Sequence, residues 1–222
     1  MCKHSLVVPE LIIFDCDGVL VDSEKLAIKI DQEFLLEIGI SMSLEEIVKK
    51  FVGKSDQYFQ LEIERLVGLN LVPNWKSDLD DRYNQVFAKE LKPVNGIIEV
   101  LESLEVPVCV ASSGSQKKIR NSLELTSLSG YFGENIFSAE QVSKGKPDPE
   151  LFLFAAAQME ANPAKTVVVE DSNAGVLAGV AAQMHVFGYC GSVTPKSDLL
   201  ISGVTPFDQM NELLLAISAK NN

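Results

Sequence analysis

Basic residues are scarce in this chain of 222 residues. It has 19 Lys and Arg against 31 Asp and Glu, which gives a formal net charge of −12. A surface this acidic repels the phosphate backbone of nucleic acids and the anionic face of a membrane. We therefore expect neither nucleic acid nor a membrane surface among the partners of the protein.

Long apolar runs are absent as well. No run approaches the ~20 residues that a membrane-spanning helix needs. The apolar stretch over residues 6–14 is interrupted by Pro9 and Glu10 and has no small-residue cleavage site, so it is unlike a signal peptide. It is better interpreted as a first buried strand.

Cysteine is sparse, with four residues at positions 2, 16, 109 and 190. Their spacing matches no zinc pattern, and two of them lie in apolar, strand-like runs, which favours small buried side chains over disulfides. We expect a reducing compartment, the cytoplasm. The composition is otherwise that of a folded globular protein, with 46% hydrophobic and 23% charged residues.

Runs of β-branched apolar residues alternate with helical patterns in the second half of the chain. The runs predict strands at Leu11–Asp17, Val106–Ser112, Thr166–Asp171 and His185–Cys190, with a weaker one at Asn135–Ala139. The helical patterns are Ser115–Leu125, Pro149–Met159 and Ser172–Ala182, and Phe207–Lys220 is predicted as a closing helix. This alternation is typical of an α/β fold, a Rossmann-like doubly wound parallel sheet with helices on both faces.

The first and second predicted strands are separated by far more chain than the dozen or so residues that a crossover requires. The pattern in this gap is helical, at Ser23–Ile38, Ser43–Phe51, Ser55–Val67 and Trp75–Leu91. We therefore expect a small helical bundle, residues 19–93, inserted into a discontinuous α/β core formed by residues 1–18 and 94–222.

Polar side chains follow the predicted strands where the strands end. Asp15 and Asp17 close the first strand and Glu170 and Asp171 close the fourth, while Ser112 ends the second. Ligands of open α/β sheets bind beyond the carboxyl ends of the strands. These residues are therefore expected to converge on one crevice.

The chemistry of this set points to phosphoryl transfer. Crowded carboxylates repel one another, and oxygen-only ligands select a hard cation such as Mg²⁺. Lys146 lies in a proline-rich loop before a helix and would complete a phosphate site, with backbone amides at Ser113 and Gly114 as further donors. A carboxylate nucleophile, Mg²⁺, a hydroxyl and a lysine are the components of catalysis through an aspartyl-phosphate.

Four motifs in order resemble those of the haloacid dehalogenase superfamily, in its phosphatase group with a helical cap inserted after the first strand. The first is Asp-x-Asp-Gly-Val-Leu at residues 15–20, and the second is the strand-ending Ser112. The third is Lys146 before a helix start, and the fourth is the acidic pair followed by Ser-x-x-Gly at residues 170–175. The resemblance spans the whole chain, and the inserted bundle stands where that family has its cap.

The resemblance implies a role for each of these residues. Asp15 is then the nucleophile and Asp17 the general acid and base. Mg²⁺ is held by Asp15, by Asp171 and by Asp17 through its backbone carbonyl. Ser112, Ser113 and Lys146 hold the phosphate oxygens. Glu170 either binds the metal, directly or through water, or pairs with a neighbouring base.

Two groups of basic residues outside these motifs are interpreted differently. Lys54 lies in a turn of the cap that in such proteins can point into the active site, so it is a candidate for contact with the polar end of a substrate. Lys117, Lys118 and Arg120 are interpreted as the solvated face of a helix.

The expected substrate is a small phosphorylated metabolite, a phosphomonoester of a sugar or sugar acid. The alternative is a phosphomutase acting on a sugar phosphate, which would share every core residue. Related mutases carry a histidine soon after the first motif, and residues 23–27 have none. A catalytically silent binding protein is a third interpretation, and a dehalogenase is disfavoured because that branch generally lacks the second aspartate. The sequence leaves the oligomeric state open and is compatible with a monomer.

Overall fold

The computed structural model describes residues 9–68 and 73–218. Within these residues a six-stranded, wholly parallel sheet has the order β3-β2-β1-β4-β5-β6. The strands are β1 Leu11–Phe14, β2 Val108–Ser112, β3 Ile136–Ser138, β4 Thr166–Glu170, β5 His185–Tyr189 and β6 Val204–Phe207. The predicted α/β class is confirmed. The chain lays β2 and β3 on one side of β1 and returns to place β4 on the other, so the strand order reverses beside β1.

Helices cover both faces of this sheet. They are α5 Ile97–Ser103, α6 Gln116–Leu125, α7 Ser129–Phe132, α8 Glu150–Gln158, α9 Asn173–Ala181, α10 Lys196–Leu199 and α11 Met210–Ser218. Leu11 and Ile13 pack with α8 and α9, whereas Ile12 and Phe14 belong to a second apolar cluster with α5, α7 and α11. All four side chains of β1 are fully buried, which explains why its sequence is continuously apolar instead of alternating.

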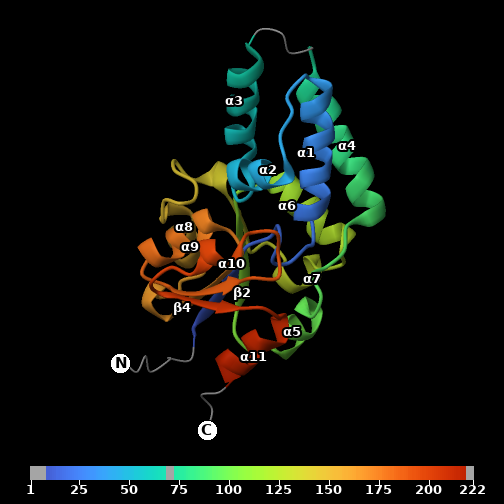
Figure 1. Ribbon diagram of the computed structural model, residues 1–222. Coiled ribbons are helices and arrows are strands. Elements are labelled where there is room, and N and C mark those ends of the chain that lie inside the picture. Colours follow the sequence, from blue (N-terminus) through green and yellow to red (C-terminus); the bar gives the residue numbers. More distant parts are fainter. Residues whose placement is uncertain (1–8, 69–72, 219–222) are drawn as a thin grey trace.

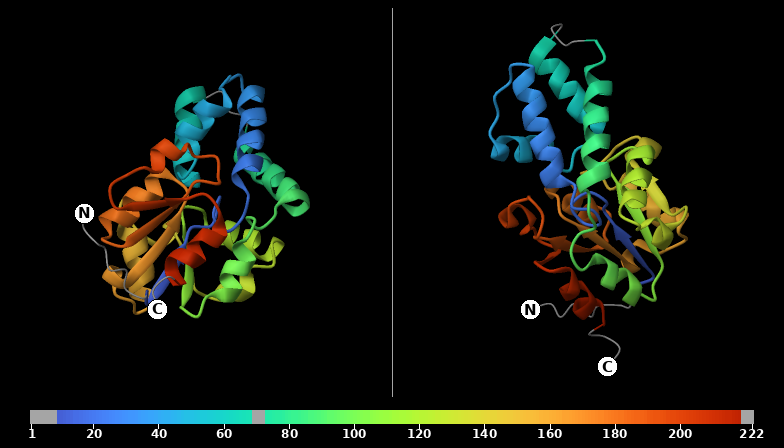
Figure 2. Two further views of the ribbon diagram at one scale, coloured as in Figure 1. Left: turned by 60° about the horizontal axis from the view of Figure 1, so that its bottom comes forward. Right: turned by 90° about the vertical axis from the view of Figure 1, so that its right-hand side faces the viewer.

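Four helices lie between β1 and the rest of the core, as predicted. They are α1 Glu24–Glu37, α2 Leu44–Phe51, α3 Asp56–Val67 and α4 Trp75–Glu90. Ser43 and Ser55 accept hydrogen bonds from the first turns of α2 and α3, so the sequence signals for helix starts are satisfied. Figure 1 and the right-hand view of Figure 2 show these helices gathered as an upright bundle on one side of the α/β core.

The predicted end of the chain is wrong in one respect. Phe207 belongs to the edge strand β6, and the last helix begins only at Met210; residues 219 and 220 of the predicted helix lie outside the described part. Pro206 obscures this strand in the sequence, because proline has no N–H for a sheet ladder. An edge strand tolerates it, and β6 pairs only with β5.

The cysteines of the described residues are free thiols. Cys16 and Cys109 are buried, as expected, and Cys190 is half-buried, while Cys2 lies outside the described residues. Among residues 9–68 and 73–218, none of the helices combines the length and the apolar character that crossing a bilayer requires.

Candidate active site

The carboxyl ends of β1, β2 and β4 bring the predicted polar residues together. β1 is hydrogen-bonded to β2 on one side and to β4 on the other, and the backbone N–H of Asp15 still donates to Val169 O at 2.9 Å. Ser112, Glu170 and Asp171 are each 1% exposed. The site therefore lies where the strand order reverses, which is the usual ligand position in such sheets.

Lys146 reaches into the centre of this group from the loop before α8. Its ammonium lies 2.5 Å from Asp15 Oδ1 and 2.7 Å from Glu170 Oε1, and it also donates to Ala111 O at 2.9 Å. Burial alone would lower the pKa of Lys146, but the two adjacent carboxylates outweigh it and hold that pKa above its ordinary value. Lys146 is therefore a buried, permanently charged cation beside Asp15.

Three carboxylates next to Lys146 form a group suited to a divalent cation. One oxygen each of Asp15, Glu170 and Asp171 lies within 4.8 Å of the others. Burial, followed by the charges of neighbouring acids, raises the pKa of Asp171 well above its ordinary value. Burial, opposed by Lys146, raises the pKa of Asp15 to about 7. The carboxylates are therefore crowded in a way that a bound cation would relieve.

The hydrogen bonds separate the three carboxylates by role. Asp171 Oδ2 is buried, and within residues 9–68 and 73–218 no donor makes a well-formed hydrogen bond to it, although the nearby Ser192 hydroxyl favours the charged form of Asp171. Glu170, in contrast, accepts from Lys146 through one oxygen and from the N–H and hydroxyl of Ser172 through the other, at 2.8 and 2.9 Å. Asp171 thus has a free acceptor for a hard cation, whereas both oxygens of Glu170 are already engaged. The all-oxygen donor set fits Mg²⁺.

Two glycines make room for these carboxylates. A Cβ at Gly18 would lie 2.0 Å from Asp171 Oδ2, and a Cβ at Gly175 would lie 1.7 Å from Glu170 Oε1. Both contacts are far shorter than any real side chain allows. Gly18 and Gly175 are therefore required because any larger residue would overlap Asp171 and Glu170, respectively.

A tight turn after β2 supplies donors beside the carboxylates. Ser112 Oγ accepts from the N–H of Gly114 at 3.2 Å, and Ser115 caps the start of α6. Ser113 donates through its hydroxyl to Gly53 O of the helical bundle at 3.4 Å. Two of the predicted phosphate-binding residues, Ser112 and Ser113, thus lie in the turn at the amino end of α6, where backbone N–H groups favour an anion.

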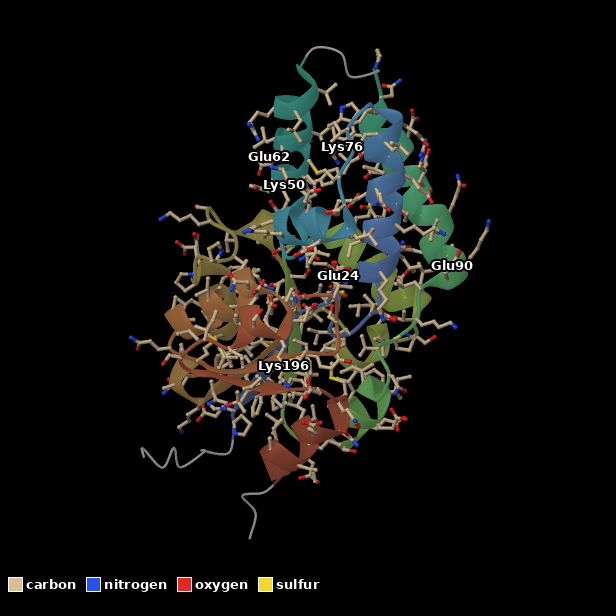
Figure 3. All side chains as sticks on the ribbon, in the orientation of Figure 1. Glu24, Lys50, Glu62, Lys76, Glu90 and Lys196 are labelled. Atoms are coloured by element: carbon tan, nitrogen blue, oxygen red, sulfur yellow. The ribbon has the colours of Figure 1, made fainter. Side chains whose placement is uncertain are left out.

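The side chain of Asp17 lies apart from the three carboxylates of Asp15, Glu170 and Asp171. Its side chain is not in the acidic cluster; Ser23 donates to its Oδ1 at 2.5 Å, and Lys118 Nζ lies 3.8 Å from its Oδ2. Next to Ser23, Glu24 is buried at the lower end of α1, where the bundle meets the core (Figure 3). Burial, followed by the charge of Asp17, raises the pKa of Glu24 to about 8.

The interpretation of Lys118 as part of a solvated face is wrong. Lys117 is exposed and Arg120 pairs with Glu134 on the surface, as expected, but Lys118 turns inward to Asp17. The signal was available in its position, three residues after the helix cap Ser115. The first turn of a helix that follows a strand's carboxyl end faces the ligand crevice.

Lys54 is not among the residues that the structure brings together at the carboxylates. Its ammonium lies 5.9 Å from the centroid of the Tyr58 ring, in a hollow of the bundle also lined by Lys49 and Lys50. Its neighbour Gly53 contacts the turn after β2, because the hydroxyl of Ser113 donates to Gly53 O.

Sequences similar to this chain include named phosphatases. Residues 12–189 match the haloacid dehalogenase-like hydrolase family. The 6-phosphogluconate phosphatase of Escherichia coli is 32% identical over 92% of this chain and 92% of its own length. The phosphorylated carbohydrates phosphatase of Thermotoga maritima is 30% identical over 92% and 96%.

Solved structures of proteins with the same fold are similar to this chain over nearly its whole length. A haloacid dehalogenase-like protein of unknown function from Agrobacterium tumefaciens superposes with a TM-score of 0.80 at 32% identity, covering 96% of this chain and 99% of its own. A putative beta-phosphoglucomutase from Thermotoga maritima reaches 0.75 at 27% identity, over 95% and 99%. The chain belongs to the haloacid dehalogenase-like hydrolases and is a phosphoric monoester hydrolase of that family.

Proposed function

We propose that the protein is a Mg²⁺-dependent phosphatase of small sugar or sugar-acid phosphates that acts through a phosphoryl group on Asp15. The observation that carries this proposal is the buried pair of Asp15 and Lys146 next to the unpartnered oxygen of Asp171. The named activities of the two curated relatives supply the substrate class.

The reaction begins with attack of an Asp15 carboxylate oxygen on phosphorus, and the ester P–O bond breaks. Asp17 gives its proton to the departing oxygen. Ser112, Lys146 and the amides at Ser113 and Gly114 hold the phosphate oxygens in place. Water then attacks the phosphoryl group on Asp15 while Asp17 takes a proton from it, which releases phosphate and restores both aspartates.

The carboxylates beside Lys146 would also hold the cation. Asp15, Asp171 and the backbone carbonyl of Asp17 would hold it, with Glu170 acting through water because both of its oxygens are engaged. When bound, Mg²⁺ supplies positive charge that offsets the repulsion between these acids and the substrate phosphate. Asp15 gains from this charge, because burial raises its pKa and so disfavours the ionised form that attacks phosphorus.

Residues 19–93 would act as a cap over a core formed by residues 1–18 and 94–222. The contact from Ser113 to Gly53 O joins a turn of the cap to the turn after β2, residues 112–115, which we call the phosphate turn because it would hold the phosphate. A cap that closes there excludes water and contacts the leaving group.

A phosphomutase is the second candidate, favoured by the likeness to a putative beta-phosphoglucomutase. Both activities use a phosphoryl group on Asp15, but a mutase returns it to sugar and a phosphatase passes it to water. A catalytically silent binding protein would do neither. Incubation with a panel of sugar and sugar-acid phosphates separates the three. A phosphatase releases free phosphate, a mutase forms an isomerised sugar phosphate, and a silent binding protein forms neither product.

The two aspartates test the mechanism itself. Asp15→Asn should give no phosphorylated protein by mass spectrometry after acid quench. Asp17→Asn should fold normally and lose about 10²–10⁴-fold in kcat on alkyl esters, the range for a general acid and base. A phosphoryl group found on any residue other than Asp15 would refute this division of roles.

A further inference from the structure

Lys118 runs from the core into the junction between core and cap. Its aliphatic stem lies against the phosphate turn, since Cδ is 3.5 Å from where a Cβ of Gly114 would be. Its ammonium lies 3.8 Å from Asp17 Oδ2 and 5.8 Å from the centroid of the Tyr83 ring on α4. One side chain of the core thus contacts both the proposed acid and a cap helix.

The cap brings two buried acids to this place. Glu24 and Asp31 of α1 are buried, and the hydroxyl of Tyr83 donates to Asp31 Oδ1. The charge of Asp17 contributes to the raised pKa of Glu24, and the charge of Lys118 opposes it. Glu24 of the cap thus lies within reach of the charges of Asp17 and Lys118, and Lys118 is the cation among these acids.

Each of the two oxygens of Asp17 has a partner of its own. Ser23 donates to Oδ1 at 2.5 Å, and Lys118 attracts Oδ2. Without the second restraint, the carboxylate can turn about the bond to Ser23, and its two oxygens are no longer distinguished. A proton donor that is misplaced by a fraction of an ångström loses much of its effect.

We propose that Lys118 is a positioning residue, which keeps Asp17 directed at the leaving-group oxygen when the cap is closed. This inference rests on the proposed aspartyl-phosphate mechanism. It predicts that loss of Lys118 slows the reaction more when the leaving group needs protonation more. It also predicts that the positive charge of Lys118 is required.

The experiment compares Lys118→Met with Lys118→Arg and with Lys117→Met, a control on the same helix whose side chain is exposed. One probe is p-nitrophenyl phosphate, whose leaving group departs as a stable anion. The others are the alkyl esters 6-phosphogluconate, sorbitol 6-phosphate and glycerol 3-phosphate, of which the best wild-type substrate is used. For each variant with each substrate, kcat and kcat/KM are measured. The thermal stability of each variant is measured as well.

For Lys118→Met we expect kcat and kcat/KM on the alkyl ester to fall about 10–100-fold, part of the full effect of a general acid. On p-nitrophenyl phosphate kcat/KM should change by less than about threefold, because that step needs no proton donor. Lys118→Arg should restore most of the loss, and Lys117→Met should match the wild type. Should Lys118→Met fail to fold, Lys118→Gln keeps the stem and polar end without the charge.

Three results would overturn the inference. Equal losses on both kinds of ester would indicate a structural role, and an increase in KM with an unchanged kcat would indicate direct substrate binding. If the wild type is active and Lys118→Met has the same kcat and kcat/KM on the alkyl ester, Lys118 has no role in positioning Asp17. Absence of turnover by the wild type would overturn the proposed function, and this inference with it.

Discussion

Asp171 occupies the space in which a side chain at Gly18 would begin, so that a Cβ there would meet Asp171 Oδ2 at 2.0 Å. Gly18 also has φ of +77°, a region that other residues enter at a cost. The loop after β1 and the loop after β4 are thus fitted to each other at the one oxygen of Asp171 that has no hydrogen bond. The nucleophile's loop and the proposed metal ligand cannot be altered independently.

Gly18→Ala should therefore abolish cation binding and activity. Gly39→Ala is the matched control, because Gly39 has φ of +83° but nothing within 4 Å of its Cβ position. Both variants should lose about 1–2 kcal/mol of stability from backbone strain. Only Gly18→Ala should also lose the increase in Tm that Mg²⁺ gives the wild type. A Gly18→Ala protein with wild-type Mg²⁺ response would contradict the fit described here.

Removal of the metal should stop turnover, and Mg²⁺ should restore it. In Asp171→Asn the Mg²⁺ concentration for half-maximal activity should rise by at least about 10–100-fold, the effect of losing even an indirect metal contact. Glu124→Gln, an exposed acid on α6, is the control and should not change it. Full activity after rigorous chelation would contradict the proposed metal site.

The core and its site were largely predictable because buried parallel strands have a distinctive sequence. β1 and β4 are continuous apolar runs that end in acids, and the polar ends meet wherever such strands pair. Periodicity is a weaker guide to what a polar side chain faces. It marked Lys118 as polar but could not show that α4 and Asp17 lie beside it.

The partners of Lys146 illustrate the same limit. Its loop position predicted a phosphate-binding cation. That it pairs with both Asp15 and Glu170 depends on how the loop before α8, β1 and β4 meet, and these segments are distant in sequence. The edge strand β6 was missed for a different reason, since Pro206 is compatible with a strand only at a sheet edge. Which strand forms the edge is a property of the topology.

Removal of the positive charge of Lys146 should lower kcat/KM severely. Lys146→Ala leaves Asp15 and Glu170 buried without their shared partner, and it should lower transition-state stabilisation by about 2–4 kcal/mol, measured from kcat/KM. Lys144→Ala is the control in the same loop, because its side chain is 73% exposed and pairs only loosely with Asp148 at 3.7 Å. Similar losses in the two variants would mean that loop conformation, and not the buried charge, is responsible.

Lys54 should affect substrates selectively if the cap turn contacts the leaving group. Lys54→Ala should lower kcat/KM by about 10-fold or more for 6-phosphogluconate, whose tail is anionic, the scale of one charge-assisted hydrogen bond. It should leave p-nitrophenyl phosphate nearly unchanged. Lys49→Ala, an exposed lysine of the same hollow, is the control. Equal losses on both substrates would place Lys54 outside a specificity role.

The buried Glu24 should make the metal-free protein less stable as pH rises. Its pKa is about 8 in the folded state against 4.5 for an ordinary glutamate, so between these values the folded protein holds a proton that the unfolded chain has released. The free energy of unfolding contributed by this group is therefore fully present below pH 4.5 and is lost as pH rises through about 8. Asp15, with a pKa raised to about 7, acts in the same direction.

Glu24→Gln removes this titration while keeping the shape of the side chain. In EDTA, the variant should exceed the wild type in free energy of unfolding by on the order of 2–4 kcal/mol at pH 8.5, and by little at pH 5. Glu33→Gln on the same helix is the control, because Glu33 is exposed and should leave the pH profile unchanged. Urea unfolding across this pH range measures the difference. A wild-type profile that is flat, or that rises with pH in parallel with Glu24→Gln, would show that Glu24 is not held protonated in the folded protein.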